Sequence, residues 1–322
     1  MVKRIFRALI RLNYSEWDYN HHLGGDSLQS LVFGCNNIFN FDESASEVDF
    51  EEAFLLLEDI WYPEDSNLIS LGGGYWDGGV LAGLRDRLDS SAIEILRRSF
   101  RSNYFELEGD VLGLIAPIRE DITREIPIGT QYSRARLGVK DRLKISGAYG
   151  DWNANYYYLP FSQVEIGRPP VVKVTEGRLN RPRVSILYLA SDPLTAVAEL
   201  RPHPGHLVST AKFATLRSLQ IADLSRHDIR NFLSDERLED LRRILSLSAV
   251  INLPIQPEQG ELYLITQLFS DCFRKAGYEG LAFRSSLGPG INLACFVPEA
   301  LAQVPDSETV LEVSTLQYQL CL

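Results

Sequence analysis

The stretch from Gly177 to Gly205, GRLNRPRVSILYLASDPLTAVAELRPHPG, carries the most informative local pattern in this chain of 322 residues. The residues from Ser185 to Ala190 are typical of a strand. Ser191-Asp192-Pro193 then predicts the start of a helix, because an Asp cap followed by proline in the first turn favours one. Thr195 and Glu199 lie four residues apart, which places both on one face of that helix. The pattern therefore predicts a strand followed by a short helix with a carboxylate near its end.

Short strands and helices alternate on either side of this stretch. Further strands are predicted at Val171–Val174, Leu207–Phe213, Leu219–Leu224 and Leu281–Phe283, and helices at Asp192–Leu200, Arg237–Leu247 and Leu262–Ala276. Before them, apolar residues at helical spacing predict helices at Val48–Trp61 and Ser90–Phe105. We therefore predict an α+β domain over residues 126–322, preceded by a mainly helical, acidic domain of unknown role over residues 1–125.

The charge distribution narrows the possible partners. Lys and Arg number 32 against 43 Asp and Glu, and the segment from Leu12 to Leu84 contains no Lys or Arg but fourteen acidic residues. Because nucleic-acid binding needs Lys and Arg against phosphates, no nucleic-acid partner is expected. No apolar run approaches the ~18 residues of a membrane span, so we expect a cytoplasmic protein without a membrane partner.

The sequence also gives little support for a metal site or a nucleotide-binding loop. The four cysteines form no CxxC pair, and His21, His22, His203, His206 and His227 lack an accompanying ligand set, so no metal site is expected. The loop Gly72–Gly79 lacks the order of a phosphate-binding glycine motif. For Glu199, helical periodicity alone leaves open a solvent-facing side chain paired with Arg201.

Several blocks in order along the chain carry a family resemblance. They are Tyr132–Gly138 (YSRARLG), Pro169-Pro170, Gly177–Asn180 (GRLN), Leu187–Gly205, Tyr263–Gln267 (YLITQ), Gly277–Leu281 (GYEGL) and Ser285-Ser286. Together they resemble the RES domain family of NAD-degrading toxins, which are usually paired with an Xre-type antitoxin. This chain departs from the family pattern by one extra residue between Tyr132 and Arg134, and by Glu279 where Asp is usual.

The resemblance implies a fold like that of ADP-ribosyltransferases and cleavage of NAD at the nicotinamide–ribose bond, by water or by phosphate. It implies Arg134, Glu199 and Ser285 as catalytic residues. Breaking this N-glycosidic bond develops a positive charge on the ribose, which a carboxylate such as Glu199 would stabilise. Ser285 would hold the nicotinamide ribose or the attacking group. Since neighbouring side chains of an extended segment face opposite ways, only one of Ser285 and Ser286 should enter the site.

The resemblance implies further residues that bind NAD: Arg136, Arg178, Tyr188, Thr266, Gln267 and Ser286. Tyr188 would stack on the cationic nicotinamide ring, and Arg134 and Arg178 would grip the pyrophosphate. Arg136 is either a helper or a strand-edge charge. Thr266 and Gln267 open a helix, where they would anchor the site.

Two other functions stay open. One is an ADP-ribosyltransferase that modifies a protein or a small molecule, and the other is an inactive module that only binds NAD. No cofactor is expected beyond NAD as substrate, with inorganic phosphate as a candidate co-substrate. Expected partners are an Xre-type antitoxin or other inhibitory protein, and a second copy in a homodimer. The acidic N-terminal stretch would restrain the pocket, recognise a basic partner, or serve as a solvated surface.

Overall fold

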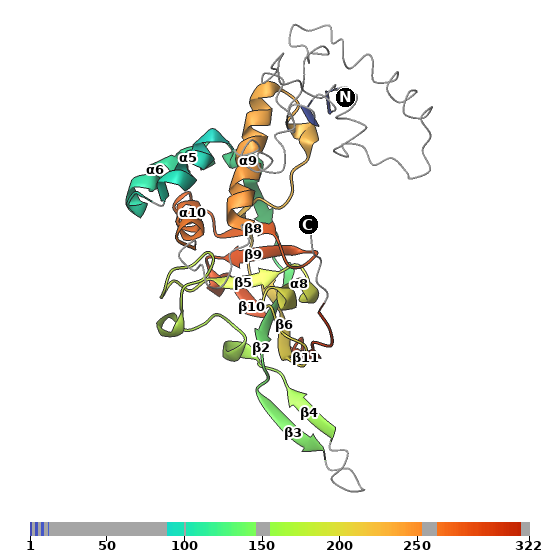
Figure 1. Ribbon diagram of the computed structural model, residues 1–322. Coiled ribbons are helices and arrows are strands. Elements are labelled where there is room, and N and C mark those ends of the chain that lie inside the picture. Colours follow the sequence, from blue (N-terminus) through green and yellow to red (C-terminus); the bar gives the residue numbers. More distant parts are fainter. Residues whose placement is uncertain are drawn as a thin grey trace, which may run out of the picture. The chain divides into compact units, whose positions relative to one another are not determined.

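The computed structural model describes residues 1, 4–5, 8–9, 12, 89–99, 101–145, 155–252 and 263–316 (Figure 1). The chain divides into two compact units, one of residues 1–94 with 227–246 and the other of residues 95–226 with 247–322. The predicted helix Val48–Trp61 and the loop Gly72–Gly79 lie outside the described residues. The domain boundary near residue 125 stays a prediction.

In the described range 89–122, the helices are α5 (Ser90–Ser99), α6 (Tyr104–Ile115) and α7 (Arg119–Ile122), and the strand β1 (Thr123–Ile126) follows. The helix predicted over Ser90–Phe105 is confirmed from Ser90 to Ser99, but it does not continue to Phe105, because a second helix begins at Tyr104. Asn103 has extended backbone angles, and its side chain accepts a hydrogen bond from Phe105 N, so it caps a new helix. Asparagine favours such a cap over the interior of a helix, which explains the break.

The larger unit contains a mixed sheet, which confirms the α+β prediction. Its strands are β1 (Thr123–Ile126), β2 (Gln131–Leu137), β5 (Leu187–Ala190), β6 (Leu207–Thr215), β7 (Leu219–Asp223), β8 (Gly280–Arg284), β9 (Ile291–Cys295), β10 (Leu301–Gln303) and β11 (Thr309–Glu312). They follow the order β1-β7-β8-β9-β5-β2-β6-β10, and β11 also pairs with β6. The β7–β8 pair is parallel and the other described pairs are antiparallel. Strands β3 (Asp141–Ile145) and β4 (Asn155–Leu159) form a separate two-stranded ribbon (Figure 1).

The remaining helices are α8 (Pro193–Ala198), α9 (Asp235–Asn252) and α10 (Tyr263–Lys275), with short 3-10 turns at Gln163–Glu165, Val171–Lys173, Ile229–Asn231 and Pro298–Ala300. The predicted strand Val171–Val174 is thus wrong. Lys173 N donates to Pro170 O over 2.8 Å, and Val172 is 85% exposed. Proline fixes the backbone ahead of this turn, and no neighbouring strand offers a ladder to these valines in the described part of the chain.

Alternating side chains give the sheet two distinct faces. One face carries the hydrophobic core, which includes Leu187 and Leu189 of β5, Ala211 and Phe213 of β6, and Leu293 and Cys295 of β9. Helix α8 packs against β2, β5, β6 and β9. Because Tyr188 pairs with Ala294 and Ala190 with Asn292, these four residues project together from the face opposite the core. Within the described ranges, no helix has the length and apolar composition that a bilayer crossing requires.

Candidate active site

Helix α8 begins at a heavily hydrogen-bonded aspartate. Asp192 Oδ1 accepts from Thr195 N over 2.8 Å, and its Oδ2 accepts from the hydroxyls of Thr195 (2.8 Å) and Ser191 (2.9 Å). Burial raises the pKa of Asp192, but these hydrogen bonds outweigh burial and hold the pKa below its usual range. The helix is six residues long and ends with Glu199 as its C-cap. The predicted strand–helix unit is confirmed.

The loop between β8 and β9 is fixed to the start of this helix. Gly290 N donates to Thr195 Oγ1 over 2.9 Å, and Ile291 N donates to Ser191 Oγ over 3.0 Å. A Cβ on Gly288 would lie 2.8 Å from the Cα of Thr195, so only glycine allows this approach. Thr195 is fully buried, which makes the contact rigid.

Glu199 and Ser285 meet across this contact. Ser285 Oγ donates to Glu199 Oε1 over 2.6 Å, and the same oxygen of Ser285 accepts from the main-chain nitrogens of Leu287 (3.1 Å) and Gly288 (2.9 Å). Glu199 is partly buried. Among the described residues, Oε2 of Glu199 accepts no hydrogen bond and Arg201 forms no ion pair with it. The surface pairing with Arg201 that the sequence left open is therefore not observed.

Asn292 completes this cluster, although it was not predicted from the sequence as a site residue. Its Nδ2 donates to Glu199 Oε1 over 2.7 Å, and the residue is 7% exposed. Strand alternation in INLACF separates Asn292 from the core residue Leu293, and a lone polar residue in such a strand is the signal that could have indicated it. Ser286 is exposed, so Ser285 is the serine that contacts Glu199.

A second cluster surrounds Tyr188. Its hydroxyl donates to Asn180 Oδ1 over 2.9 Å and accepts from Leu179 N over 3.0 Å, which ties the loop Gly177–Asn180 to β5. Burial raises the pKa of Tyr188, because the phenolate would lose its hydration. The hydroxyl is thus committed to the loop, and only the ring is left to contact a ligand.

Two α10 side chains hold the same loop from inside. Thr266 is fully buried and donates to the carbonyl of Arg178, and Gln267, 3% exposed, donates from Nε2 to Gly177 O over 2.9 Å. The Arg178 guanidinium donates to Ile251 O over 2.8 Å. The structure therefore places Thr266 and Gln267 where they position Arg178.

Arg134 is not brought to Glu199. Its Nη1 donates to Tyr188 O over 2.8 Å, and its Nε donates to Ile166 O. Ser133 pairs with Ala190, so alternation along β2 directs Arg134 to the core face, opposite Asn292. Burial, with a smaller contribution from the charge of Arg136, lowers the pKa of Arg134 to about 10. No carboxylate of the described ranges pairs with this guanidinium.

Arg136 lies further along β2 and is exposed. Its guanidinium carbon lies 4.2 Å from the ring centroid of Phe161, and it donates to Glu165 O. These contacts tie β2 to the turn at Gln163–Glu165, which fits the strand-edge role that the sequence left open for Arg136.

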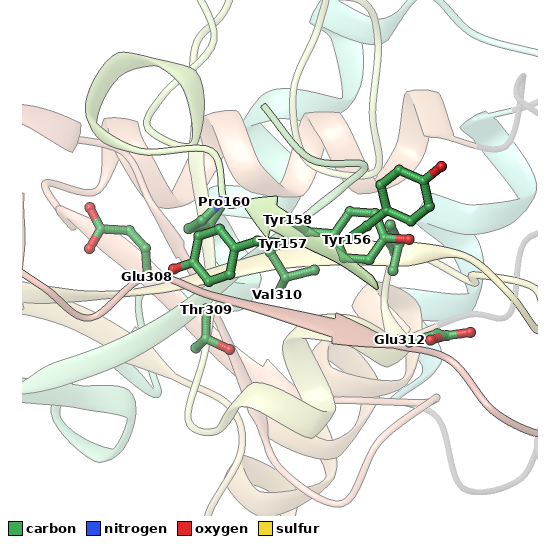
Figure 2. Close-up of a pocket in the computed structure, with 9 residues that line it drawn as sticks. Tyr156, Tyr157, Tyr158, Pro160, Glu308, Thr309, Val310 and Glu312 are labelled. Atoms are coloured by element: carbon green, nitrogen blue, oxygen red, sulfur yellow. The ribbon is translucent and has the colours of Figure 1, made fainter. Parts of the chain in front are cut away.

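Two further features lie outside these clusters. The described residues form a cavity of about 470 Å³ beside β4 and β11, and none of the predicted site residues lines it (Figure 2). No group of three or more His, Cys, Asp or Glu side chains in the described ranges could hold a metal ion. His21 and His22 lie outside the described residues, and His203 N donates to His206 Nδ1 within a turn.

Comparisons with known proteins give a match to a family model and a match to a solved structure. Residues 152–318, just over half of the chain, match the family model described as RES domain. This range contains Glu199 and Ser285 but neither Arg134 nor Arg136. No curated protein gives a significant match. Among solved structures, the MbcT–MbcA toxin–antitoxin complex of M. tuberculosis gives a TM-score of 0.32 at 13% identity, covering 63% of this chain and 92% of that chain.

Proposed function

Because the chain belongs to the RES domain family, whose model spans Glu199 and Ser285, we propose that it cleaves NAD at the nicotinamide–ribose bond. The bond between the ribose C1″ and the ring nitrogen breaks, and its electron pair leaves with neutral nicotinamide. A water or phosphate oxygen bonds to C1″, giving ADP-ribose with release of a proton, or ADP-ribose-1″-phosphate.

The observation that carries this proposal is the asymmetric environment of the Glu199 carboxylate. Ser285 and Asn292 both donate to Oε1, whereas Oε2 accepts nothing from the described residues. A carboxylate held by one oxygen has a fixed orientation, and its second oxygen can accept a ribose hydroxyl and face the cation that develops at C1″. Such preorganised charge stabilises the transition state more than the ground state.

Ser285 serves this proposal as a positioning residue. Its proton is donated to Glu199, and its oxygen already accepts two main-chain N–H groups. An oxygen engaged in this way is a poor nucleophile, so attack by the acceptor does not need Ser285. Its hydrogen bonds couple the Glu199 carboxylate to the loop that Gly288 and Gly290 fix against α8.

The second cluster would bind the rest of NAD. Tyr188 and Asn292 share a sheet face at diagonal positions of neighbouring strands, a spacing of about 7–8 Å that side chains of this size can bridge. The proposal assigns the Tyr188 ring to the nicotinamide, and Arg178 to the pyrophosphate. Arg134, on the opposite face of the sheet, would contribute to this site indirectly, because its Nη1 donates to Tyr188 O and holds the strand that carries the Tyr188 ring.

The test is release of nicotinamide from NAD by the purified full chain, compared with Glu199→Gln. Glutamine keeps the size of the side chain and removes its charge, so we expect a rate loss of about 10²–10³-fold. Phosphorus NMR with and without inorganic phosphate identifies the product and hence the acceptor. Equal turnover of the two proteins, with matching circular dichroism spectra, would remove Glu199 from the mechanism. A labelled adduct on a protein or small molecule would instead establish an ADP-ribosyltransferase.

Family membership also supports a role as a toxin that depletes NAD, held in check by an Xre-type antitoxin, with association into a homodimer. Co-expression with a candidate antitoxin should abolish growth arrest and NAD loss together. Growth arrest that persists while NAD stays constant would contradict this role.

A further inference from the structure

The cavity beside β4 and β11 is separate from every residue assigned to NAD above. It is lined by Tyr156, Tyr157, Tyr158, Pro160, Leu207, Glu308, Thr309, Val310 and Glu312. At about 470 Å³, it falls within the size range of ligand-binding pockets, which is about 300–1,000 Å³. Two glutamates and three tyrosines are therefore among the residues that line a space large enough for a long side chain.

The charged residues that line this cavity are both glutamates. Figure 2 shows Glu308 and Glu312 towards its two ends, with the tyrosines of β4 between them. Glu308 is partly buried and accepts a hydrogen bond from Gln303, and Glu312 is exposed. Neither carboxylate forms an ion pair with any described residue, and no Lys or Arg lines the cavity. A cation would supply the missing countercharge.

The tyrosines favour the same kind of occupant. Aromatic faces attract a guanidinium or an ammonium group, and carboxylates nearby add charge-assisted hydrogen bonds. The ribbon already contains one such contact, since the guanidinium carbon of Arg142 lies 3.5 Å from the ring centroid of Tyr156. A guanidinium therefore fits against this run of rings.

The exposed residues around the cavity favour a protein as its binding partner over a small ion. Tyr157, which lines the cavity, is 56% exposed, and Leu143, its partner on β3, is 45% exposed. Exposed tyrosine and leucine around a pocket offer contact area that a single small cation would leave uncovered. In the described part of the chain, β4 pairs only with β3 and β11 only with β6, so each keeps a strand edge without a partner.

We propose that this cavity, which we call the tyrosine–glutamate pocket, binds an arginine or lysine side chain from a basic segment of a partner protein. Glu308 and Glu312 neutralise the cation, the tyrosine rings pack against it, and the exposed residues of the rim contact the flanking segment. The proposal uses none of the residues assigned to NAD, so it stands or fails independently of the proposed activity.

The experiment measures binding of a fluorescein-labelled peptide of alternating glycine and arginine to the full chain, by fluorescence anisotropy in about 0.15 M salt. We expect saturable binding that weakens at least tenfold in the double variant Glu308→Gln/Glu312→Gln. The matched control is Glu106→Gln/Glu120→Gln, which removes the same charge from exposed helix positions and should bind as the wild type does. Tyr157→Leu, at a mostly exposed position, should weaken binding without unfolding the protein.

Three outcomes would overturn the proposal. Equal weakening in the control double variant would mean that the peptide responds only to net charge. Unchanged binding by Tyr157→Leu and by the pocket double variant would exclude the pocket. Displacement of the peptide by tetramethylammonium at equal concentration would show a site for small cations and not for a partner segment. A peptide with citrulline in place of arginine, neutral and of similar shape, should not bind.

Discussion

Gly290 approaches Asp192 so closely that no side chain fits at position 290. A Cβ there would overlap Asp192 Oδ2 and Ser191 Oγ and would lie 2.6 Å from Thr195 Oγ1. Both main-chain polar groups of Gly290 form hydrogen bonds. Its nitrogen donates to Thr195 Oγ1, and its carbonyl accepts from Ser285 N over 3.0 Å. The position of Ser285 therefore depends on this close packing.

Replacing this glycine should disturb stability and activity together. Gly290→Ala forces the loop away from α8, and overpacking of this kind costs about 1–3 kcal/mol of unfolding free energy. Because Ser285 moves with the loop, nicotinamide release should also fall. Thermal unfolding and the NAD assay measure the two effects.

Gly109→Ala is the control for this substitution. Gly109 lies within α6, and a Cβ there would meet nothing within 4 Å, so alanine should be neutral or slightly stabilising in the helix. Full activity of Gly290→Ala at an unchanged unfolding temperature would show that the loop does not hold Ser285.

The sequence predicted the part of the site that depends on helix capping and on spacing along the helix. The Asp cap and proline predicted the start of α8, and the spacing from it placed Glu199 at the end of that helix. The family resemblance added Ser285, and the structure brings the two side chains within 2.6 Å. Their meeting depends on the docking of a distant loop, which helical periodicity cannot indicate.

The remaining features depend on sheet register. Asn292 reaches Glu199 only because β9 pairs with β5, and Arg134 is turned to the core face because Ser133 pairs with Ala190. A shift of one residue would exchange the faces of either strand. Periodicity gives the alternation along a strand but not which strand lies beside it. For the same reason, the prediction of a strand at Val171–Val174 failed, since no strand among the described residues pairs with this segment.

Asn292 should act by positioning Glu199. Asn292→Asp places a second carboxylate 2.7 Å from Glu199 Oε1, in place of a hydrogen-bond donor. Two adjacent carboxylates resist being ionised together, so kcat should fall and the acid limb of the pH–rate profile should move to higher pH. Asn292→Ala removes one hydrogen bond without adding charge, and we expect a loss of about tenfold in kcat. Identical pH profiles for the two variants would contradict this role.

Arg134 should affect both stability and NAD binding. Its Nε and Nη1 donate to two different carbonyls, a fork that lysine cannot reproduce. Arg134→Lys should therefore cost about 2 kcal/mol of unfolding free energy. Because Nη1 holds the strand that carries the Tyr188 ring, KM for NAD should rise as well, by about tenfold. A stability loss with an unchanged KM would restrict Arg134 to a structural role, and Arg136→Lys, at an exposed position, should have a smaller effect on stability.

Asp223, at the end of β7, should make stability depend on pH. It is 7% exposed and accepts hydrogen bonds from Ser225 and from Arg124 Nη1, the latter over 2.8 Å. Burial raises its pKa, but these donors outweigh burial and hold the pKa below the usual range. The stabilisation is therefore present above the unfolded-state pKa of about 3.9 and is lost as pH falls through the lower folded-state pKa.

Asp223→Asn tests this linkage by urea unfolding at about pH 7 and at about pH 2. At neutral pH the variant should be less stable by about 2 kcal/mol, because Arg124 loses its charged acceptor. The acidic pH lies below the unfolded-state pKa of about 3.9, where the stabilisation by the charged carboxylate is being lost, so the difference should shrink. Asp306→Asn, at an exposed position whose left-handed backbone (φ 56°) suits either residue, should change the unfolding free energy by less than about 0.5 kcal/mol. A difference for Asp223→Asn that stays constant between the two pH values would mean that the charge of Asp223 does not stabilise the fold.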